Sequence, residues 1–157
     1  MMKIAIFVDI QNIYYTTKEK FNRSFNYKKF WEEIESKGNI VKANAYAIDK
    51  GDPKQQKFQY AIQSIGFTVK LKPFISRMDG SAKGDWDVGI TIDVLNSAKE
   101  VEKIILLSGD GDFDLLVKKV IEDYDCEVDV YGVEELTANS LVDSASSFHA
   151  ISDRFLI

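Results

Sequence analysis

The sequence predicts a single α/β domain of three layers, with a mostly parallel central sheet of about five strands. Short apolar and β-branched runs alternate along the chain with segments whose apolar residues recur at helical spacing. The chain has 157 residues, about the size of one domain with one buried core. We therefore expect residues 1–157 to form one folding unit.

The strands and helices follow from this alternation, taken in chain order. Apolar or β-branched runs predict strands at residues 3–9, 40–48, 67–72, 101–108 and 126–133. The first of these runs is almost continuously apolar, as expected of a strand covered on both faces. Apolar residues at helical spacing predict helices at residues 26–38, 52–67, 112–125 and 137–148. Pro53 suits the start of the second helix, and Gly38 and Gly66 suit helix ends.

Two neighbouring segments are less regular. Residues 73–84 are polar and contain glycine, which predicts an exposed loop, and loops of that length are often functional. The following segment, residues 85–94, alternates polar and apolar residues as a strand does. It also fits a helix with Val88, Ile92 and Leu95 facing inward, so its local pattern leaves both structures open.

Composition limits the classes of function. The formal net charge of −5 argues against indiscriminate duplex binding through a basic surface. Lysines and arginines do cluster locally, and these clusters are more often solvated helix faces than binding sites. The single cysteine, Cys126, excludes an intramolecular disulfide, and its apolar neighbours favour a buried, inert thiol. No window approaches the roughly 20 apolar residues of a membrane span, so we expect a cytoplasmic protein.

Acidic residues stand where two predicted strands end. Asp9 closes the first strand, and Asp110 and Asp112 follow the fourth in the stretch LLSGDGDF. Ligands of open parallel sheets bind beyond the carboxyl ends of the strands, so Asp9 and Asp110 meet if their strands are neighbours. Carboxylates held together need a compensating cation to remain ionised, and hard oxygen ligands suit Mg²⁺ or Mn²⁺.

Each acid also has a structural explanation. Asp112 suits the N-cap of a helix that begins near Phe113, and Asp9 suits a turn. Asn12 suits the cap of a helix after the first strand. Capping does not explain Asp110 in its glycine-flanked turn, and this residue favours the metal site most strongly.

Several enzyme classes lack their characteristic residues. His149 is the only histidine, which argues against histidine acid–base catalysis and a histidine-rich zinc site. The chain has no P-loop motif. An aspartyl-phosphate phosphatase would have an acid two residues after Asp9, where this chain has Gln11. A phospho-receiver domain would leave the pair Asp110 and Asp112 unexplained.

Three motifs occur in order between about residues 4 and 120: VDIQN, KGDWD and SGDGDF. Together they resemble the NYN domain family, and within it the LabA-like bacterial branch. This family belongs to the PIN-like superfamily of metal-dependent ribonucleases, with a Rossmann-type fold. The resemblance implies that residues 85–98 form a helix.

The resemblance also implies a set of site residues. Its metal-binding and catalytic acids correspond here to Asp9, Asp87, Asp110 and Asp112. Asn12 and Ser108 match supporting positions. Lys83 is expected four residues before Asp87 on the same helical face, either contacting a substrate phosphate or paired with Asp87. Asp93 also matches a frequent acid, but six residues from Asp87 is about 120° around a helix, which suggests a rim or structural role.

The function implied is hydrolysis of RNA phosphodiester bonds with Mg²⁺ or Mn²⁺ as cofactor and RNA, expected to be single-stranded, as substrate. Tyr14, Tyr15 and Trp86 could stack on bases, although aromatic residues so placed are more often packing residues. An alternative function of a different class stays open, in which the protein is a non-catalytic RNA-binding or regulatory module that retains the metal site.

Overall fold

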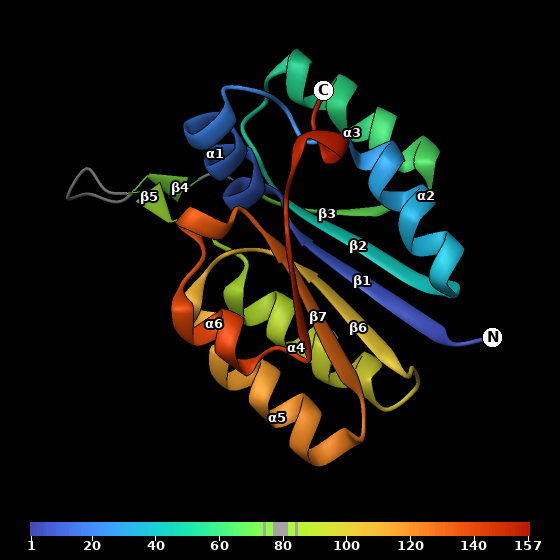
Figure 1. The fold of residues 1–157 in the computed structure, drawn as a ribbon. Helices are drawn as coiled ribbons and strands as arrows, with labels where there is room; N and C mark the ends of the chain where they lie inside the picture. Colours follow the sequence, from blue (N-terminus) through green and yellow to red (C-terminus); the bar gives the residue numbers. More distant parts are fainter. Residues whose placement is uncertain (74, 77–81, 84) are drawn as a thin grey trace.

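A six-stranded parallel sheet lies at the centre of the computed structural model, which describes residues 1–73, 75–76, 82–83 and 85–157 (Figure 1). Its strand order is β3-β2-β1-β6-β7-β8, and neighbouring strands are parallel throughout. The strands are β1 (Lys3–Asp9), β2 (Asn39–Asp49), β3 (Thr68–Pro73), β6 (Lys103–Leu107), β7 (Glu127–Gly132) and β8 (Ser147–Ala150).

Helices cover both faces of this sheet, which gives the three layers expected from the sequence. One face carries α1 (Ile10–Phe21), α2 (Tyr27–Lys37) and α3 (Pro53–Ile65). The other carries α4 (Asp87–Ala98), α5 (Asp114–Tyr124) and α6 (Asn139–Ser144). Among the described residues, no helix is both long enough and apolar enough to cross a membrane.

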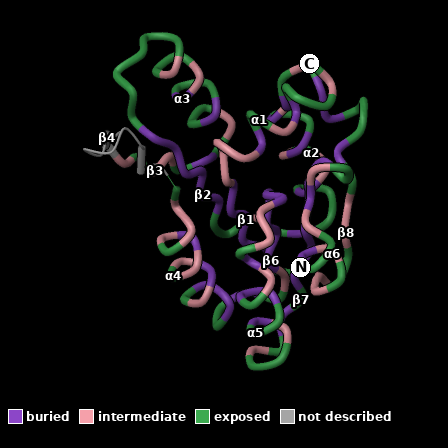
Figure 2. The backbone as a smooth tube through the Cα atoms, turned by 90° about the vertical axis from the view of Figure 1, so that its left-hand side faces the viewer, coloured by how far each residue is buried: buried purple, intermediate pink, exposed green. Residues whose placement is uncertain are grey.

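Strand β1 shows why its sequence is almost continuously apolar. Ile4, Ile6 and Val8 pack into the core beneath α1, α2 and α3. Ala5 and Phe7 point the other way, into the core beneath α4, α5 and α6. Successive side chains of a strand alternate between faces, so a strand covered on both sides needs apolar residues at every position. Figure 2 shows this burial along the central strands.

The connections reverse direction between β1 and β6. From β1 the chain adds β2 and β3 on one side, and from β6 it adds β7 and β8 on the other. Ligands of open α/β sheets bind at the carboxyl ends of the strands at such a switch point. The strand order therefore predicts a ligand site at the carboxyl ends of β1 and β6.

The five expected strands are present, as are helices α2, α3 and α5, with ends that differ by at most two residues. The helix expected at residues 137–148 is wrong in its second half. Helix α6 ends at Ser144, and β8 adds a sixth strand beside β7. Ser146 exchanges hydrogen bonds with the backbone of Val128, donating from its amide (2.8 Å) and accepting at its hydroxyl (3.0 Å), which starts this pairing.

The expected loop at residues 73–84 contains regular structure. Two short antiparallel strands, β4 (Ile75–Ser76) and β5 (Ala82–Lys83), pair there. They lie at the carboxyl-end side of the main sheet (Figure 1). Residues 74, 77–81 and 84 of the expected loop lie outside the described residues.

Helix α4 resolves the ambiguous segment as the resemblance implies, but it begins at Asp87 rather than at residue 85. The Asp85 carboxylate accepts a hydrogen bond from the Asp87 amide (3.2 Å) before the helix starts. Lys83 belongs to β5, so the expectation that it shares a helical face with Asp87 is wrong. The chain is still extended at Lys83.

Cys126 is buried and free, as expected. Burial raises the pKa of its thiol to about 11, so the reactive thiolate is suppressed at neutral pH.

Candidate metal centre

Asp9 and Ser108 come together because β1 and β6 are paired to their ends, with Val8 opposite Leu107. The buried Ser108 hydroxyl donates to Oδ2 of Asp9 (3.0 Å) and accepts from the Asp110 amide (3.2 Å). One side chain at the end of β6 thus fixes the acid of β1 and the backbone of the next acid.

Asn12 joins the same two strand ends from the helix side. Its Oδ1 accepts a hydrogen bond from the Gly109 amide (2.8 Å). The expected cap role of Asn12 is wrong. Asp9 is the N-cap of α1, and its Oδ1 accepts from the Asn12 amide (3.4 Å). Asp9 is therefore held at both carboxylate oxygens.

The glycines of SGDGDF are needed for close packing against the segment before α6. A Cβ on Gly109 would lie 2.9 Å from Thr137 Oγ1 and 3.0 Å from the Leu136 carbonyl oxygen. A Cβ on Gly111 would lie 2.8 Å from the Ala138 Cβ. Larger residues at either position would push the turn that carries Asp110 away from Asp9.

The capping assignment of the two acids after β6 is reversed. Asp110 is the N-cap of a 3₁₀ turn at Gly111–Phe113, and its Oδ1 accepts from the Asp112 amide (2.9 Å). Helix α5 begins after this turn without a side-chain cap, so Asp112 does not cap it. The 3₁₀ turn occupies the expected start of the helix, so α5 begins at Asp114, which a pattern of residue types does not reveal.

Asp87 enters from the first turn of α4. One carboxylate oxygen from each of Asp9, Asp87 and Asp110 lies within 4.8 Å of the others. Asp112 is exposed and is not part of this group of three, which we call the acid cluster.

Trp86 anchors the start of α4 beside the sheet. Its Nε1 donates to the Ala47 carbonyl (2.8 Å), and its ring centroid lies 5.2 Å from that of Tyr46. The ammonium group of Lys72 lies 4.5 Å from the indole centroid. Trp86 is thus a packing residue that positions Asp87.

Electrostatic repulsion is concentrated in the acid cluster. Burial, followed by the charges of Asp110, Asp85, Asp9 and Asp112, raises the pKa of Asp87 to about 7. Burial is also the main cause that raises the pKa of Asp9, against the hydrogen bonds from Asn12 and Ser108. Ionising all three acids together is therefore costly without a nearby positive charge.

A divalent metal ion suits this donor set. Carboxylate oxygens are the ligands preferred by Mg²⁺ and Mn²⁺. Among the residues with described side chains, no lysine or arginine forms an ion pair with an acid of the cluster. A cation bound by the three oxygens would supply the missing charge, so the residues present fit such an ion.

Other acids near the cluster differ in their surroundings. Asp85 is exposed, but its charge helps to raise the pKa of both Asp9 and Asp87, a contribution that its motif position did not reveal. Asp93 accepts hydrogen bonds at Oδ2 from Tyr46 (2.7 Å) and Lys70 (2.8 Å). Asp93 therefore belongs to a separate polar network.

Comparisons with known proteins identify the family of this chain. The family model of the NYN domain matches residues 3–152. The low amplitude and bright protein LabA of Synechococcus elongatus is 26% identical over 159 residues, covering 96% of this chain and 84% of LabA. A crystal structure of a Vibrio parahaemolyticus protein of unknown function matches with a TM-score of 0.95 and 51% identity, covering 99% of this chain and 96% of that chain. The chain belongs to the NYN domain family.

Proposed function

We propose that the protein is a ribonuclease that hydrolyses phosphodiester bonds of RNA and depends on Mg²⁺ or Mn²⁺. The observation that carries this proposal is the acid cluster itself. Three carboxylates from separate elements converge within 4.8 Å at the switch point of an open parallel sheet. The resemblance of the NYN domain to PIN-like ribonucleases supports RNA, in single-stranded form, as the substrate.

Asp9, Asp87 and Asp110 are the proposed metal ligands. A bound divalent ion would activate a water molecule and neutralise the charge that develops on the phosphate. The protein fixes two of these ligands through its own hydrogen bonds. The Asn12 amide and the Ser108 hydroxyl hold Asp9, and the Asp112 amide holds Asp110. Such supporting bonds orient metal ligands and restrict their motion.

Two further residues have proposed roles near the substrate. Asp112 is exposed two positions after Asp110, where its carboxylate could accept a proton from the attacking water or orient it. Lys83 lies in β5, at the carboxyl-end side of the sheet, and we propose that it contacts a phosphate of the substrate. The cytoplasm remains the expected location, since one cysteine allows no internal disulfide.

The alternative is an RNA-binding or regulatory module that holds the metal without turnover. The acid cluster favours the enzyme, because raised carboxylate pKa values such as that of Asp87 are typical of catalytic sites.

A cleavage assay tests the proposal. Single-stranded and structured RNA are incubated with the protein in Mn²⁺, Mg²⁺ or EDTA, for wild type, Asp110→Asn and Asp123→Asn. Asp123 is an exposed acid of α5 that pairs with Lys119, so it serves as the matched control. We expect metal-dependent cleavage by wild type and Asp123→Asn only. Equal cleavage by Asp110→Asn would contradict the proposal.

A further inference from the structure

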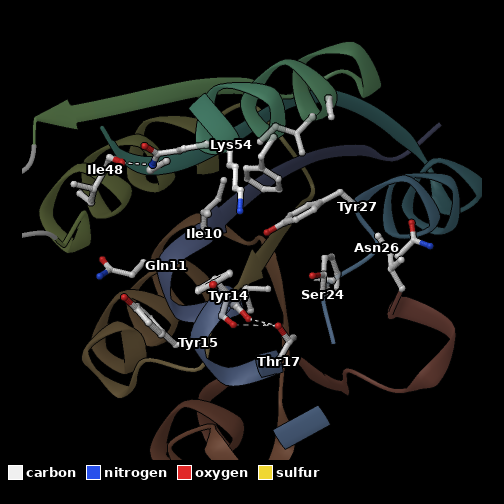
Figure 3. A pocket seen from close by; sticks show the side chains of 18 of the residues that line it. Ile10, Gln11, Tyr14, Tyr15, Thr17, Ser24, Asn26, Tyr27, Ile48 and Lys54 are labelled. Carbon is white, nitrogen blue, oxygen red and sulfur yellow. Dashed lines mark hydrogen bonds between the residues drawn. The ribbon is translucent and has the colours of Figure 1, made fainter. Parts of the chain in front are cut away.

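A pocket of about 730 Å³ opens between α1, α2 and α3 (Figure 3). Ile10 and Gln11, which directly follow Asp9 in the chain, line one side. Ala47 and Ile48, at the carboxyl end of β2, line another. The pocket thus lies at the same edge of the sheet as the acids. Its volume is typical of a small-molecule site, about 300–1,000 Å³.

The pocket wall is largely aromatic. Tyr14 and Tyr15 of α1 line it, and these residues are 54% and 52% exposed, so they are not core residues. Tyr27 and Phe58 form an edge-to-face pair on the opposite wall, with ring centroids 5.5 Å apart. Flat apolar rings suit stacking with a planar ligand.

The Tyr27 hydroxyl is a polar group in the wall of the pocket. Tyr27 is 8% exposed, and Figure 3 shows its ring reaching into the pocket with the hydroxyl directed inward. The tyrosine hydroxyls that form side-chain hydrogen bonds within the described residues are those of Tyr46 and Tyr131, not that of Tyr27. Because this hydroxyl faces the pocket and is not among the fully buried polar atoms, a ligand in the pocket can form a hydrogen bond with it. Burial and the negative charge of Asp9 raise the pKa of Tyr27.

Three basic side chains line the pocket, together with one acid, Asp52. Lys28, Lys50 and Lys54 are lining residues. Lys28 and Lys54 form no ion pair within the described part of the chain. In a protein of net charge −5, this places positive charge where aromatic rings are exposed. The combination matches a ligand with a planar ring and phosphate groups.

We propose that this pocket binds a nucleotide of the RNA strand whose scissile phosphate lies at the acid cluster. Its base packs against the aromatic wall and forms a hydrogen bond with the Tyr27 hydroxyl. Its phosphates lie beside Lys28 and Lys54. The proposal rests on the proposed ribonuclease function. It places one nucleotide of the substrate in the pocket and the scissile phosphate at the acid cluster.

Binding measurements in EDTA test the pocket apart from cleavage. The probe is a fluorescein-labelled octaribonucleotide of mixed sequence, and its fluorescence anisotropy gives the affinity. Tyr14→Ala is compared with Tyr60→Ala, because Tyr60 is 69% exposed on α3 and does not line the pocket. We expect Tyr14→Ala to weaken binding by about fivefold or more, as for loss of a stacked base, and Tyr60→Ala to have no effect.

Two further variants separate the phosphate and base contacts. Lys54→Gln should weaken binding and lower the salt dependence by about 0.7 in the log–log slope, as for loss of one phosphate contact. Lys57→Gln is its matched control, since Lys57 is exposed on the same helix outside the pocket. Tyr27→Phe keeps the ring in its core contacts and should weaken binding several-fold without changing the salt slope.

The outcomes distinguish the two proposals. If the octamer binds but the three pocket variants bind like wild type, the pocket proposal is overturned and the ribonuclease proposal is unaffected. If the variants weaken binding while wild type cuts no RNA with any metal, the pocket stands as an RNA site and the ribonuclease proposal fails. If adenosine 5′-monophosphate binds in a Tyr14-dependent manner and the octamer does not bind, the occupant is a free nucleotide, which also overturns the proposal.

Discussion

Helix α4 carries two acids in opposite electrostatic settings. Asp93 is held by Lys70 and Tyr46, and although burial acts to raise its pKa, these hydrogen bonds hold it below the ordinary value. Asp87 faces other carboxylates, and its pKa rises to about 7. The same residue type on the same helix is compensated by the protein in one place and left uncompensated in the other. An uncompensated group of acids is a candidate for an external cation.

The largest expected difference between the acid cluster and Asp93 is in cleavage activity. Asp110→Asn removes one charge from the acid cluster, and we expect it to lower metal-dependent cleavage about a hundredfold or more, beyond the 10–100-fold typical of supporting residues. Asp93→Asn should retain cleavage in its folded fraction. Single-turnover cleavage rates of both variants measure the difference. Equal losses would mean that the two acids do not differ in role.

Metal addition should reverse the pH dependence of stability. Without metal, the Asp87 pKa of about 7 lies above its ordinary value of 3.8, so the folded state binds this proton more tightly. Its stabilising effect is complete below about pH 4 and is lost as the pH rises through about 7. Manganese binds deprotonated carboxylates, so we expect it to raise the melting temperature more at about pH 8 than at about pH 5.

Differential scanning fluorimetry in EDTA and in Mn²⁺ measures this effect. At a metal concentration of about 100 times Kd, the stabilisation would be about 2.7 kcal/mol. Asp87→Asn should flatten the metal-free pH dependence. A manganese shift that is the same for Asp87→Asn and wild type would place the ion elsewhere.

In the absence of metal, substitutions of Asp93 and Asp87 should change the unfolding free energy in different directions. Asp93→Asn removes the charge that Lys70 and Tyr46 contact, and we expect a loss of about 1–2 kcal/mol in unfolding free energy. Asp87→Asn removes repulsion and should leave the metal-free protein equally or more stable. Urea denaturation in EDTA at about pH 8 checks both, with the surface pair variant Asp123→Asn expected within about 0.5 kcal/mol of wild type. Destabilisation by Asp87→Asn would contradict the account.

The smallest expected effect lies at Ser108. Ser108→Ala removes the hydroxyl that holds Asp9 and the Asp110 amide, so manganese affinity should fall about tenfold while the acids themselves remain. Isothermal titration calorimetry measures this change. Ser64→Ala, on α3 away from the cluster, is the control and should match wild type. An unchanged affinity in Ser108→Ala would show that Asp9 needs no such support.

The sequence predicts the part of the site that depends on strand ends. Asp9 and Asp110 each follow an apolar run, and parallel strands that are neighbours must bring such residues to one edge. Asp87 is different, because nothing in its local pattern distinguishes a strand from a helix at residues 85–94. Only the family resemblance assigned it to the site, and long-range packing of α4 brings it there.

Other features depend on contacts that residue types do not encode. The strand β8 forms in a serine-rich segment because it pairs with β7, and tertiary pairing overrides weak local preference there. Asp110 rather than Asp112 is the capping residue because a 3₁₀ turn precedes α5. The pocket is built from residues of three helices, the end of β2 and the segments between them, and Tyr27 takes part because α2 packs beside α3.

Helix α1 links the two proposed halves of the substrate site. It begins at Ile10, directly after its N-cap Asp9, and it carries Tyr14 five positions after Asp9. A helix rises about 1.5 Å per residue, so these residues are separated by about 7.5 Å along its axis. Helix α1 would therefore fix the distance between the bound base and the acid cluster. The position of the cut would be measured from the bound base by a rigid helix, and it would be the same on every RNA that the pocket accepts.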